Sequence, residues 1–482
     1  MPRTHHSWRV LLLTCIVAAS GCAVNPVTGE RQLALISESQ EIEMGRQGAE
    51  QVSQSIGLVE DQALQDYIQR LGMQMARTSE RPQLPWTFRV VDDPTPNAFA
   101  MPGGFIFFTR GLLAMMRSEA ELMSVMGHEI GHVTARHSVT LLSRAQLAQI
   151  GLGVGSILSP TVARFGDLLG GGLSLLFLQY GRDAERQADD LGFRYMLEQG
   201  YDARQMVNVF AALQRSGELA GQSPLPSWLA SHPHPEERIV RIQSHLAEIP
   251  QSLDQLRVGV ADYMARINGQ VFGDNPRHGF FTGTRFMHPD MRFRIDFPQG
   301  WRTQNLAQAV MAGSAEQDAI IQLTLAQGSH TQAANTFFSA QGITASRVAQ
   351  QSINGLPAVT GYFQAQTEQG VVAGLATFIT HDNRTFQILG YTPGQLLSRY
   401  DAAFRATAGS FNVLTDPQAL ARQPDRIRIV QTPSRMTLTQ FNQQFPSAIP
   451  IEQIAIINQL EGPAALIPAG YHMKRVEAGM RE

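Results

Sequence analysis

The chain is 482 residues long, which is too long for one ordinary domain and predicts two or three. Hydrophobic residues make up 43% of the sequence, enough to build packed cores. The formal net charge of −3 gives no indication of the basic surface that nucleic-acid binding requires, so nucleic acid is not an expected partner.

The N-terminal segment has the features of an export signal rather than of folded structure. Arg3 and Arg9 precede an apolar run, Val10 to Ala19, that is about ten residues long and too short to cross a bilayer. Small residues then lead to Cys22, and this order resembles the bacterial lipobox, whose cysteine is acylated. Residues 1–22 are therefore expected to be a lipoprotein signal peptide with lipidation at Cys22. The alternative is a plain cleaved signal followed by an incidental cysteine.

Lipidation at Cys22 would decide where the mature protein resides. Two or more acyl chains anchor a protein stably to a membrane, whereas one gives only marginal binding. Residue 23 is Ala rather than Asp, which resembles the signal for release to the outer membrane. Cys15 leaves with the signal, so the mature chain has no pair of cysteines for an internal disulfide. The expected location is the periplasm, with a lipid anchor at the outer membrane.

The first half of the chain is predicted to be mainly helical. An extended tether at 23–45 leads into a helical stretch at 38–80, where Leu64, Ile68, Leu71 and Met75 form one apolar face. Strands follow at 88–91 and 105–109, then helices at 118–148, at 183–199 and from Pro235 onward. The glycine-rich stretch 147–180 is predicted to be a mobile lid, because charged residues and a proline interrupt it before it could span a membrane.

The second half has a different composition and is predicted to form an α+β domain at 270–415. Residues 291–297 alternate strictly between apolar and polar side chains, which is typical of a half-buried strand. Further strands are expected at 320–325, 359–363, 376–380 and 385–389, and a helix at 394–408. A polar linker (415–425) then leads to a small module at 426–482.

The motif His128-Glu129-Ile130-Gly131-His132 carries the strongest chemical signal in the sequence. It lies in a predicted helix that Ser118 and Glu121 begin as a capping box. The spacing of four residues places both imidazoles on one helix face, where they can reach one Zn²⁺. Glu129 is then placed to act as general base on a zinc-activated water. Such a motif can occur by chance on a surface helix, but apolar neighbours indicate that this helix is buried, where two histidines and a carboxylate need a metal or a dense network.

A third zinc ligand must come from elsewhere in the chain, because catalytic zinc usually takes three protein ligands and leaves one position open. The best candidate is Glu185, which shares a helix face with Asp189. Asp189 could accept a hydrogen bond from a ligand imidazole. Taken alone, this pair is more simply a solvated acidic face.

The combined motifs resemble the peptidase family of HtpX and the CAAX prenyl endopeptidases, and within it the soluble periplasmic, BepA-like branch with its lipoprotein members. The resemblance rests on HEIGH with Ala-Arg-His at 135–137, Glu185 with Asp189, and Ser231-His232-Pro233 with Arg238, and it covers roughly residues 22–250. It implies a mainly helical zincin-like (gluzincin) domain at 23–265 with a small β-sheet. It also implies one Zn²⁺ per chain, held by His128, His132 and Glu185.

The same resemblance implies roles for two further segments. Asn97, Ala98, Phe99 and Ala100 are similar to an edge strand that lines the cleft and can bind an extended substrate. His232 would act in the site, either as a regulatory fourth ligand or as an oxyanion stabiliser. A capping or core histidine is the simpler alternative.

The terminal module at 426–482 loosely resembles a LysM fold, which implies contact with peptidoglycan. Its order of Met436-Thr437-Leu438, Ile457-Asn458 and Pro468-Ala469-Gly470 fits, but the usual Gly-Asp before Thr437 is missing. A small protein-docking domain is as good an interpretation.

The predicted fold class is α+β, and the predicted function is a zinc-dependent endopeptidase of the bacterial envelope that cuts misfolded or stalled periplasmic and outer-membrane proteins. The alternatives are a non-proteolytic assembly factor or chaperone with a structural zinc, and, less favoured, a peptidoglycan hydrolase.

Overall fold

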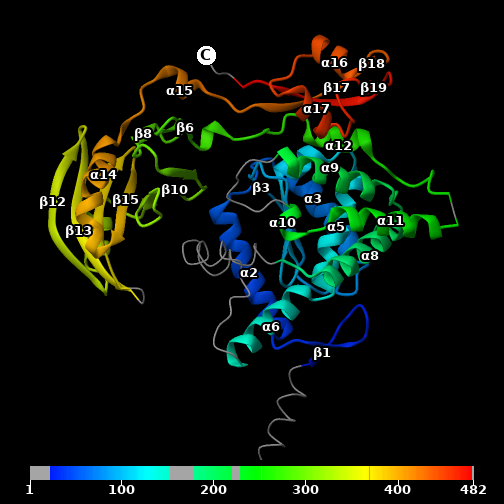
Figure 1. Cartoon of the computed structure of the whole chain (residues 1–482), viewed down its shortest axis with the longest axis horizontal. Coiled ribbons are helices and arrows are strands. Elements are labelled where there is room, and N and C mark those ends of the chain that lie inside the picture. The colour runs from blue at the N-terminus through cyan, green and yellow to red at the C-terminus, as the bar shows by residue number, and fades with distance from the viewer. Residues whose placement is uncertain (1–21, 152–178, 220–227, 251, 368–369, 480–482) are drawn as a thin grey trace, which may run out of the picture. The chain divides into compact units, whose positions relative to one another are not determined.

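The computed structural model describes residues 22–151, 179–219, 228–250, 252–367 and 370–479. The predicted signal peptide, up to residue 21, and most of the predicted lid lie outside these ranges. The chain divides into two compact units (Figure 1). The first contains residues up to 53, 57–272 and 426–477, and the second contains 273–425 with short pieces at 54–56 and from 478 onward.

The first unit begins with a hairpin of two short strands and continues with two helices and a small sheet. The hairpin pairs β1 (Cys22–Val24) with β2 (Arg31–Leu33), and the helices are α2 (Glu38–Ser55) and α3 (Gln62–Ala76). The sheet has the order β3-β5-β4, with β3 (Thr87–Val91) parallel to β5 (Phe105–Thr109), and β4 (Ala98–Met101) antiparallel to it. The predicted edge strand is thus an outer strand of this sheet.

Helices make up most of the rest of the first unit. They are α4 (Arg110–Met115), α5 (Glu119–Thr134), α6 (His137–Gly151), α8 (Arg182–Glu198), α9 (Gln205–Leu219), α10 (Trp228–Ser231), α11 (Pro235–Glu248) and α12 (Val260–Ile267). Every residue of α5 is buried, as its apolar flanks predicted, and its N-cap Ser118 accepts a hydrogen bond from the Glu121 amide. None of the helices in the described ranges has the length and hydrophobicity needed to span a bilayer.

The single helix predicted over 118–148 is wrong, because the chain breaks between α5 and α6. Arg136 adopts a left-handed conformation with φ of 57°. Its Nε donates to Glu41 Oε2 over 3.0 Å and its Nη2 to the Ile36 carbonyl over 3.0 Å. Ala, Arg and His at 135–137 contain no helix breaker, so this tertiary ion pair overrides the local helix propensity.

Residues 426–477 belong to the first unit rather than forming a compact unit of their own. They comprise β17 (Arg426–Gln431), β18 (Met436–Thr437), α16 (Leu438–Gln444), α17 (Ile451–Ile457), β19 (Leu466–Ile467) and β20 (His472–Glu477), with β17 antiparallel to β20. The likeness to a LysM module stays a prediction.

Lys474, the single lysine of the sequence, attaches β20 to the end of α4. It is fully buried, and its Nζ donates to the carbonyl oxygens of Ala114 and Met116 over 2.7 Å each. Ala114 and Met116 lie at the C-terminal end of α4, just before Ser118, the N-cap residue of α5. The C-terminal segment therefore fixes the backbone from which α5 starts.

The second unit is rich in β-structure, in agreement with the strands predicted there. Its larger sheet is antiparallel in the order β12-β13-β14-β15-β11-β10-β9, and its smaller sheet has the order β16-β8-β7-β6. The strands are β6 (Phe280–Thr282), β7 (Arg285–His288), β8 (Phe293–Asp296), β9 (Arg302–Asn305), β10 (Ala309–Gly313), β11 (Ile320–Ala326), β12 (Ile343–Ile353), β13 (Leu356–Thr367), β14 (Gly370–His381), β15 (Arg384–Pro393) and β16 (Asn412–Val413).

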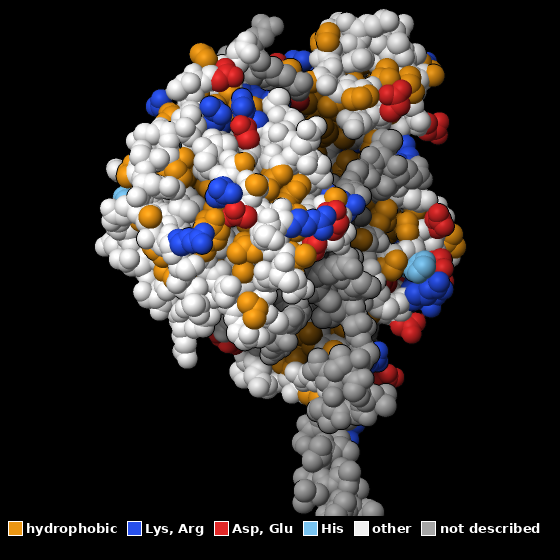
Figure 2. Space-filling view, turned by 60° about the vertical axis from the view of Figure 1, so that its left-hand side comes forward, with side chains coloured by type: hydrophobic (Ala, Val, Ile, Leu, Met, Phe, Trp, Pro, Cys, Tyr) orange, Lys and Arg blue, Asp and Glu red, His pale blue; other side chains and the backbone are white. Residues whose placement is uncertain are grey.

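Two helices pack on opposite faces of the larger sheet. α13 (His330–Phe338) contacts the face that carries Phe378, and α14 (Leu397–Ser410) contacts the face that carries Leu375. On the face drawn in Figure 2, acidic and basic side chains are scattered and intermixed among uncharged ones.

Replacing Lys474 by Met tests whether its buried amino group holds the C-terminal segment in place. The two carbonyls of Ala114 and Met116 would lose their donor inside the protein, so we expect the free energy of unfolding to fall by about 3 kcal/mol or more. Arg475→Met is the matched control, because Arg475 bonds to exposed groups, and we expect a loss of about 1 kcal/mol or less. Urea unfolding measures both, and equal losses would contradict the role assigned to Lys474.

Candidate metal centre

Four buried side chains from three parts of the first unit converge on one point. His128 and His132 come from α5, Glu185 from α8 and His232 from the residue after α10, and one ligand atom from each lies within 4.8 Å of all the others. Each is at most 2% exposed. The structure thus brings together the three predicted ligands and His232, whose role the sequence left open.

The two helices that carry the predicted ligands approach closely because their contact is made of small residues. A Cβ atom added to Gly192 of α8 would lie 2.9 Å from the backbone nitrogen of His128, and one added to Gly131 would lie 3.1 Å from the Cα of Ala188. Any side chain there would push the helices apart. The glycines therefore set the distance at which Glu185 meets the two histidines.

Nitrogen and oxygen atoms face one another across the centre at short distances. His128 Nε2 lies 3.0 Å from His132 Nε2 and 3.1 Å from His232 Nδ1. Glu185 places its carboxylate 3.4 Å from His132 Nε2, 3.6 Å from His128 Nε2 and 3.0 Å from His232 Nδ1. Trp228 stacks on the His232 ring at 4.9 Å between centroids and orients it.

Asp189 fixes the tautomer of His128. His128 Nδ1 donates to Asp189 Oδ1 over 2.9 Å, and Arg238 donates to both oxygens of the same carboxylate over 2.6 and 2.7 Å. Burial raises the pKa of Asp189, but Arg238 and His128 outweigh it and hold that pKa below its usual value. The hydrogen of His128 therefore sits on Nδ1 and its Nε2 lone pair points to the centre.

The charges around the centre favour deprotonated ligands at His132 and Glu185. Burial is the main cause that holds the pKa of His132 well below its usual value. Burial works in the opposite direction on Glu185, but His232 and His132 keep the pKa of its carboxyl well below normal. The pKa of His232 is raised, because Glu185 and Glu129 outweigh its burial.

These donors fit a zinc ion. Two imidazole lone pairs that face each other at 3.0 Å repel unless a cation or a proton lies between them, and His128 and His132 both offer Nε2 in this way. Neutral imidazole nitrogens and a carboxylate are the ligands that Zn²⁺ takes in catalytic sites. A metal would also offset the cost of burying so many polar groups together.

Glu129 lies beside this cluster with one oxygen uncommitted. Its side chain is 1% exposed, and Oε1 has no hydrogen-bond partner among the described residues, although His232 Nε2 approaches it to 3.5 Å. A buried carboxylate oxygen without a donor is costly, which is consistent with an oxygen kept available for a reacting group.

The predicted substrate strand is close to these elements. β4 packs against α5, and the Pro96 carbonyl just before it accepts a hydrogen bond from the Trp228 amide at the start of α10. Asn97 itself is buried, and its amide donates to Thr109 Oγ1 over 2.9 Å. Cys22, the predicted lipidation residue, begins β1 and pairs with Leu33 in the N-terminal hairpin.

Three residues of the site had no role assigned from the sequence. Arg238 holds Asp189, and Tyr180 stacks on the His132 ring at 4.0 Å between centroids. His137, which entered the sequence analysis only as part of the motif that carries the family resemblance, contacts His132 directly. The sequence shows that His137 follows His132 by five residues, in HEIGHVTARH. On a continuous helix, residues five apart point in different directions, so the sequence did not predict this contact.

Comparisons with known proteins find similarity to proteases. Residues 62–246 match the model of Peptidase family M48. The putative beta-barrel assembly-enhancing protease of Vibrio cholerae is 30% identical over 258 residues, which are 50% of this chain and 53% of that protein. The beta-barrel assembly-enhancing protease of Escherichia coli K12 is 28% identical over 224 residues, or 44% and 45% of the two chains.

A mitochondrial relative is similar at the same level. The mitochondrial metalloendopeptidase OMA1 of Schizosaccharomyces pombe is 29% identical over 189 residues, which are 38% of this chain and 53% of that protein. The chain spans about half the length of the curated relatives it matches.

Asp189→Asn tests whether the carboxylate behind His128 supports the metal. The amide cannot supply the same negative charge to His128 and Arg238, so we expect zinc affinity to fall about 10- to 100-fold. Asp190→Asn is the matched control, because its carboxylate bonds to Arg241 and His245 on a partly exposed surface. Chelator competition measures both affinities. A D189N protein that binds zinc as tightly as D190N would refute this role.

Proposed function

We propose that the chain is a zinc-dependent endopeptidase of the bacterial cell envelope, because residues 62–246 match the model of Peptidase family M48. The observation that carries the proposal is the convergence of His128, His132 and Glu185, all buried, next to a Glu129 oxygen that has no hydrogen-bond partner among the described residues. A catalytic zinc site needs such a ligand set and a base beside it.

Glu129 would carry the proton transfers of peptide hydrolysis. When bound, zinc lowers the pKa of water to about 7 and polarises the scissile carbonyl. Glu129 takes a proton from the attacking water and returns it to the amine of the departing product. Asp189 and Arg238 keep the lone pair of His128 directed at the centre during both steps.

His232 would restrain the enzyme rather than assist it. Its Nδ1 lies within the ligand cluster, 3.1 Å from His128 Nε2 and 3.0 Å from Glu185 Oε1. This position supports a role as fourth zinc ligand, which would occupy the place that water and substrate need. An oxyanion stabiliser would instead be expected beside the ligands, with its donor free to reach a substrate oxygen.

Substrates would bind as an added strand along β4. The sheet has the order β3-β5-β4, so the outer edge of β4 has no strand partner among the described residues. An extended peptide can pair with such an edge through its backbone, which recognises unfolded chains without demanding a particular sequence. Misfolded or stalled periplasmic and outer-membrane proteins are the substrate class that we propose.

The proposed location follows from the N-terminal sequence and from the relatives. Lipidation at Cys22 would tether the enzyme to the periplasmic side of the outer membrane. The relatives from Vibrio cholerae and Escherichia coli are named for enhancing beta-barrel assembly, which fits substrates at that membrane. We also propose that residues 426–482 contact peptidoglycan, which a binding assay with the purified polymer tests.

Glu129→Gln separates the peptidase from its rival, an assembly factor whose zinc is structural. The amide cannot accept the proton, so we expect casein cleavage to fall about 100- to 10,000-fold while bound zinc stays at one per chain. Treating the parent protein with a chelator should abolish cleavage, and Zn²⁺ should restore it. Glu198→Gln, on the exposed end of α8, is the control.

The rival function predicts the opposite pattern for the same variants. An assembly factor would retain its effect on outer-membrane proteins in cells that carry E129Q, and the wild-type protein would leave casein intact. Either result would overturn the proposed peptidase.

His232→Ala tests the restraint. If the imidazole occupies a position on the metal, its removal should increase casein cleavage several-fold at saturating zinc, because water and substrate gain access. His234→Ala is the control, since His234 lies two residues further along and outside the ligand cluster. A large loss of cleavage in H232A alone would favour the oxyanion role.

A further inference from the structure

A row of hydrogen bonds leads away from the metal centre through two residues that the proposed mechanism does not use. His132 Nδ1 lies 3.0 Å from His137 Nδ1, and His137 Nε2 lies 2.9 Å from Gln187 Oε1. His137 is 8% exposed and begins α6, whereas Gln187 is half-buried and comes from α8. The row thus joins three helices behind one ligand.

The break between α5 and α6 creates this contact. Residues five apart on a continuous helix point about 140° away from each other, so His137 could not reach His132. The left-handed Arg136 turns the chain, and Glu41 and the Ile36 carbonyl hold it there. The two rings consequently lie edge to face, with centroids 4.9 Å apart.

Only one direction of hydrogen-bond donation along this row is compatible with coordination of a metal by His132. A neutral imidazole has one N–H donor and one acceptor. Coordination through His132 Nε2 leaves the hydrogen on its Nδ1, which donates to His137 Nδ1. His137 then carries its own hydrogen on Nε2 and donates it to the amide oxygen of Gln187. An amide in the reverse orientation would donate instead, and would drive a hydrogen onto His132 Nε2, facing His128.

We propose that His137 and Gln187 are positioning residues, which fix the tautomer and the ring orientation of His132 as Asp189 does for His128. The proposal rests on the zinc site of the proposed function. The two ligand histidines would then be held by different means, His128 by a charged carboxylate and His132 by a neutral row that ends in an amide.

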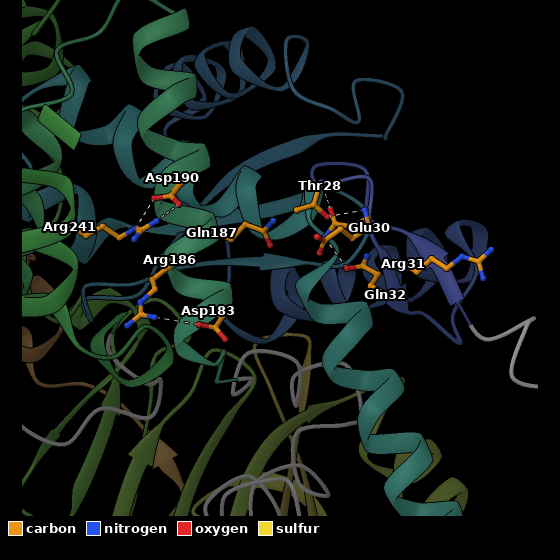
Figure 3. A pocket seen from close by; sticks show the side chains of 10 residues that line it. Thr28, Glu30, Arg31, Gln32, Asp183, Arg186, Gln187, Asp190 and Arg241 are labelled. Atoms are coloured by element: carbon orange, nitrogen blue, oxygen red, sulfur yellow. Dashed lines mark hydrogen bonds and ion pairs between the residues drawn. The ribbon is translucent and has the colours of Figure 1, made fainter. Parts of the chain in front are cut away.

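The outer end of the row, Gln187, lies at the surface of a cavity. Gln187 lines a polar cavity of about 460 Å³ between α8 and the N-terminal hairpin, together with Thr28, Glu30 and Asp183 (Figure 3). Asp183 is on the same wall, and its side chain is fully exposed. It provides a control at which a change of charge leaves the row intact.

The test compares variants that keep or remove an acceptor beside His132. We expect His137→Leu to weaken zinc binding about 10- to 100-fold, measured by chelator competition. His137→Asn places an amide oxygen near the position of Nδ1 and should recover most of that loss. Gln187→Leu should weaken binding in the same direction, and Asp183→Asn should leave it unchanged. The absorption spectrum of the Co²⁺-substituted protein should change in H137L and return toward the parent spectrum in H137N.

Separate outcomes distinguish this proposal from others. Equal zinc affinity in H137N and H137L, or a parent-like affinity in both H137L and Q187L, would refute the positioning role. A purely structural role would lower the melting temperature of the metal-free protein without the rescue by Asn. Should H137L fail to fold, the comparison of Q187L with D183N decides. A parent protein that binds no zinc would instead overturn the proposed function.

Discussion

The close contact of α5 with α8 is the constraint on which the rest of the site depends. Gly127 and Gly131 on one helix and Gly192 on the other let the two backbones approach to van der Waals distance. Only at that separation can Glu185 reach both histidines of the neighbouring helix. The contact creates an electrostatic problem, because it gathers buried imidazole lone pairs and a buried carboxylate at one point, and a divalent cation is the simplest solution.

The surrounding fold holds α5 at both ends. At its start, Glu119 accepts hydrogen bonds from Tyr67 and Tyr201, and Lys474 fixes the preceding backbone from a segment some 360 residues further along the chain. At its end, Arg136 turns the chain and is fixed by Glu41, which also binds Arg81. A helix restrained in this way can keep its ligands in place before the metal arrives, and such preorganisation is what metal binding and catalysis both require.

Much of this arrangement could be predicted from sequence, because its signals are local. The spacing of His128 and His132, the Ser118 cap and the apolar flanks together predict a buried metal-binding helix, and the structure has a buried helix there whose two histidines lie beside Glu185. Glu185 was different, since an acidic pair on a helix is more often solvated, and only the resemblance to a peptidase family singled it out. The remaining features depend on contacts between distant residues: nothing near Arg136 predicts the break that brings His137 to His132, and nothing near Lys474 predicts that residues 426–477 join the first unit.

We infer that one zinc ion is held by His128, His132 and Glu185. Anomalous X-ray diffraction from crystals of the full-length protein, collected on both sides of the zinc absorption edge, tests it most directly. We expect one strong anomalous peak within bonding distance, about 2.0–2.2 Å, of those three side chains. Well-ordered side chains with no zinc peak between them, or a zinc ion bound at another place in the chain, would contradict it.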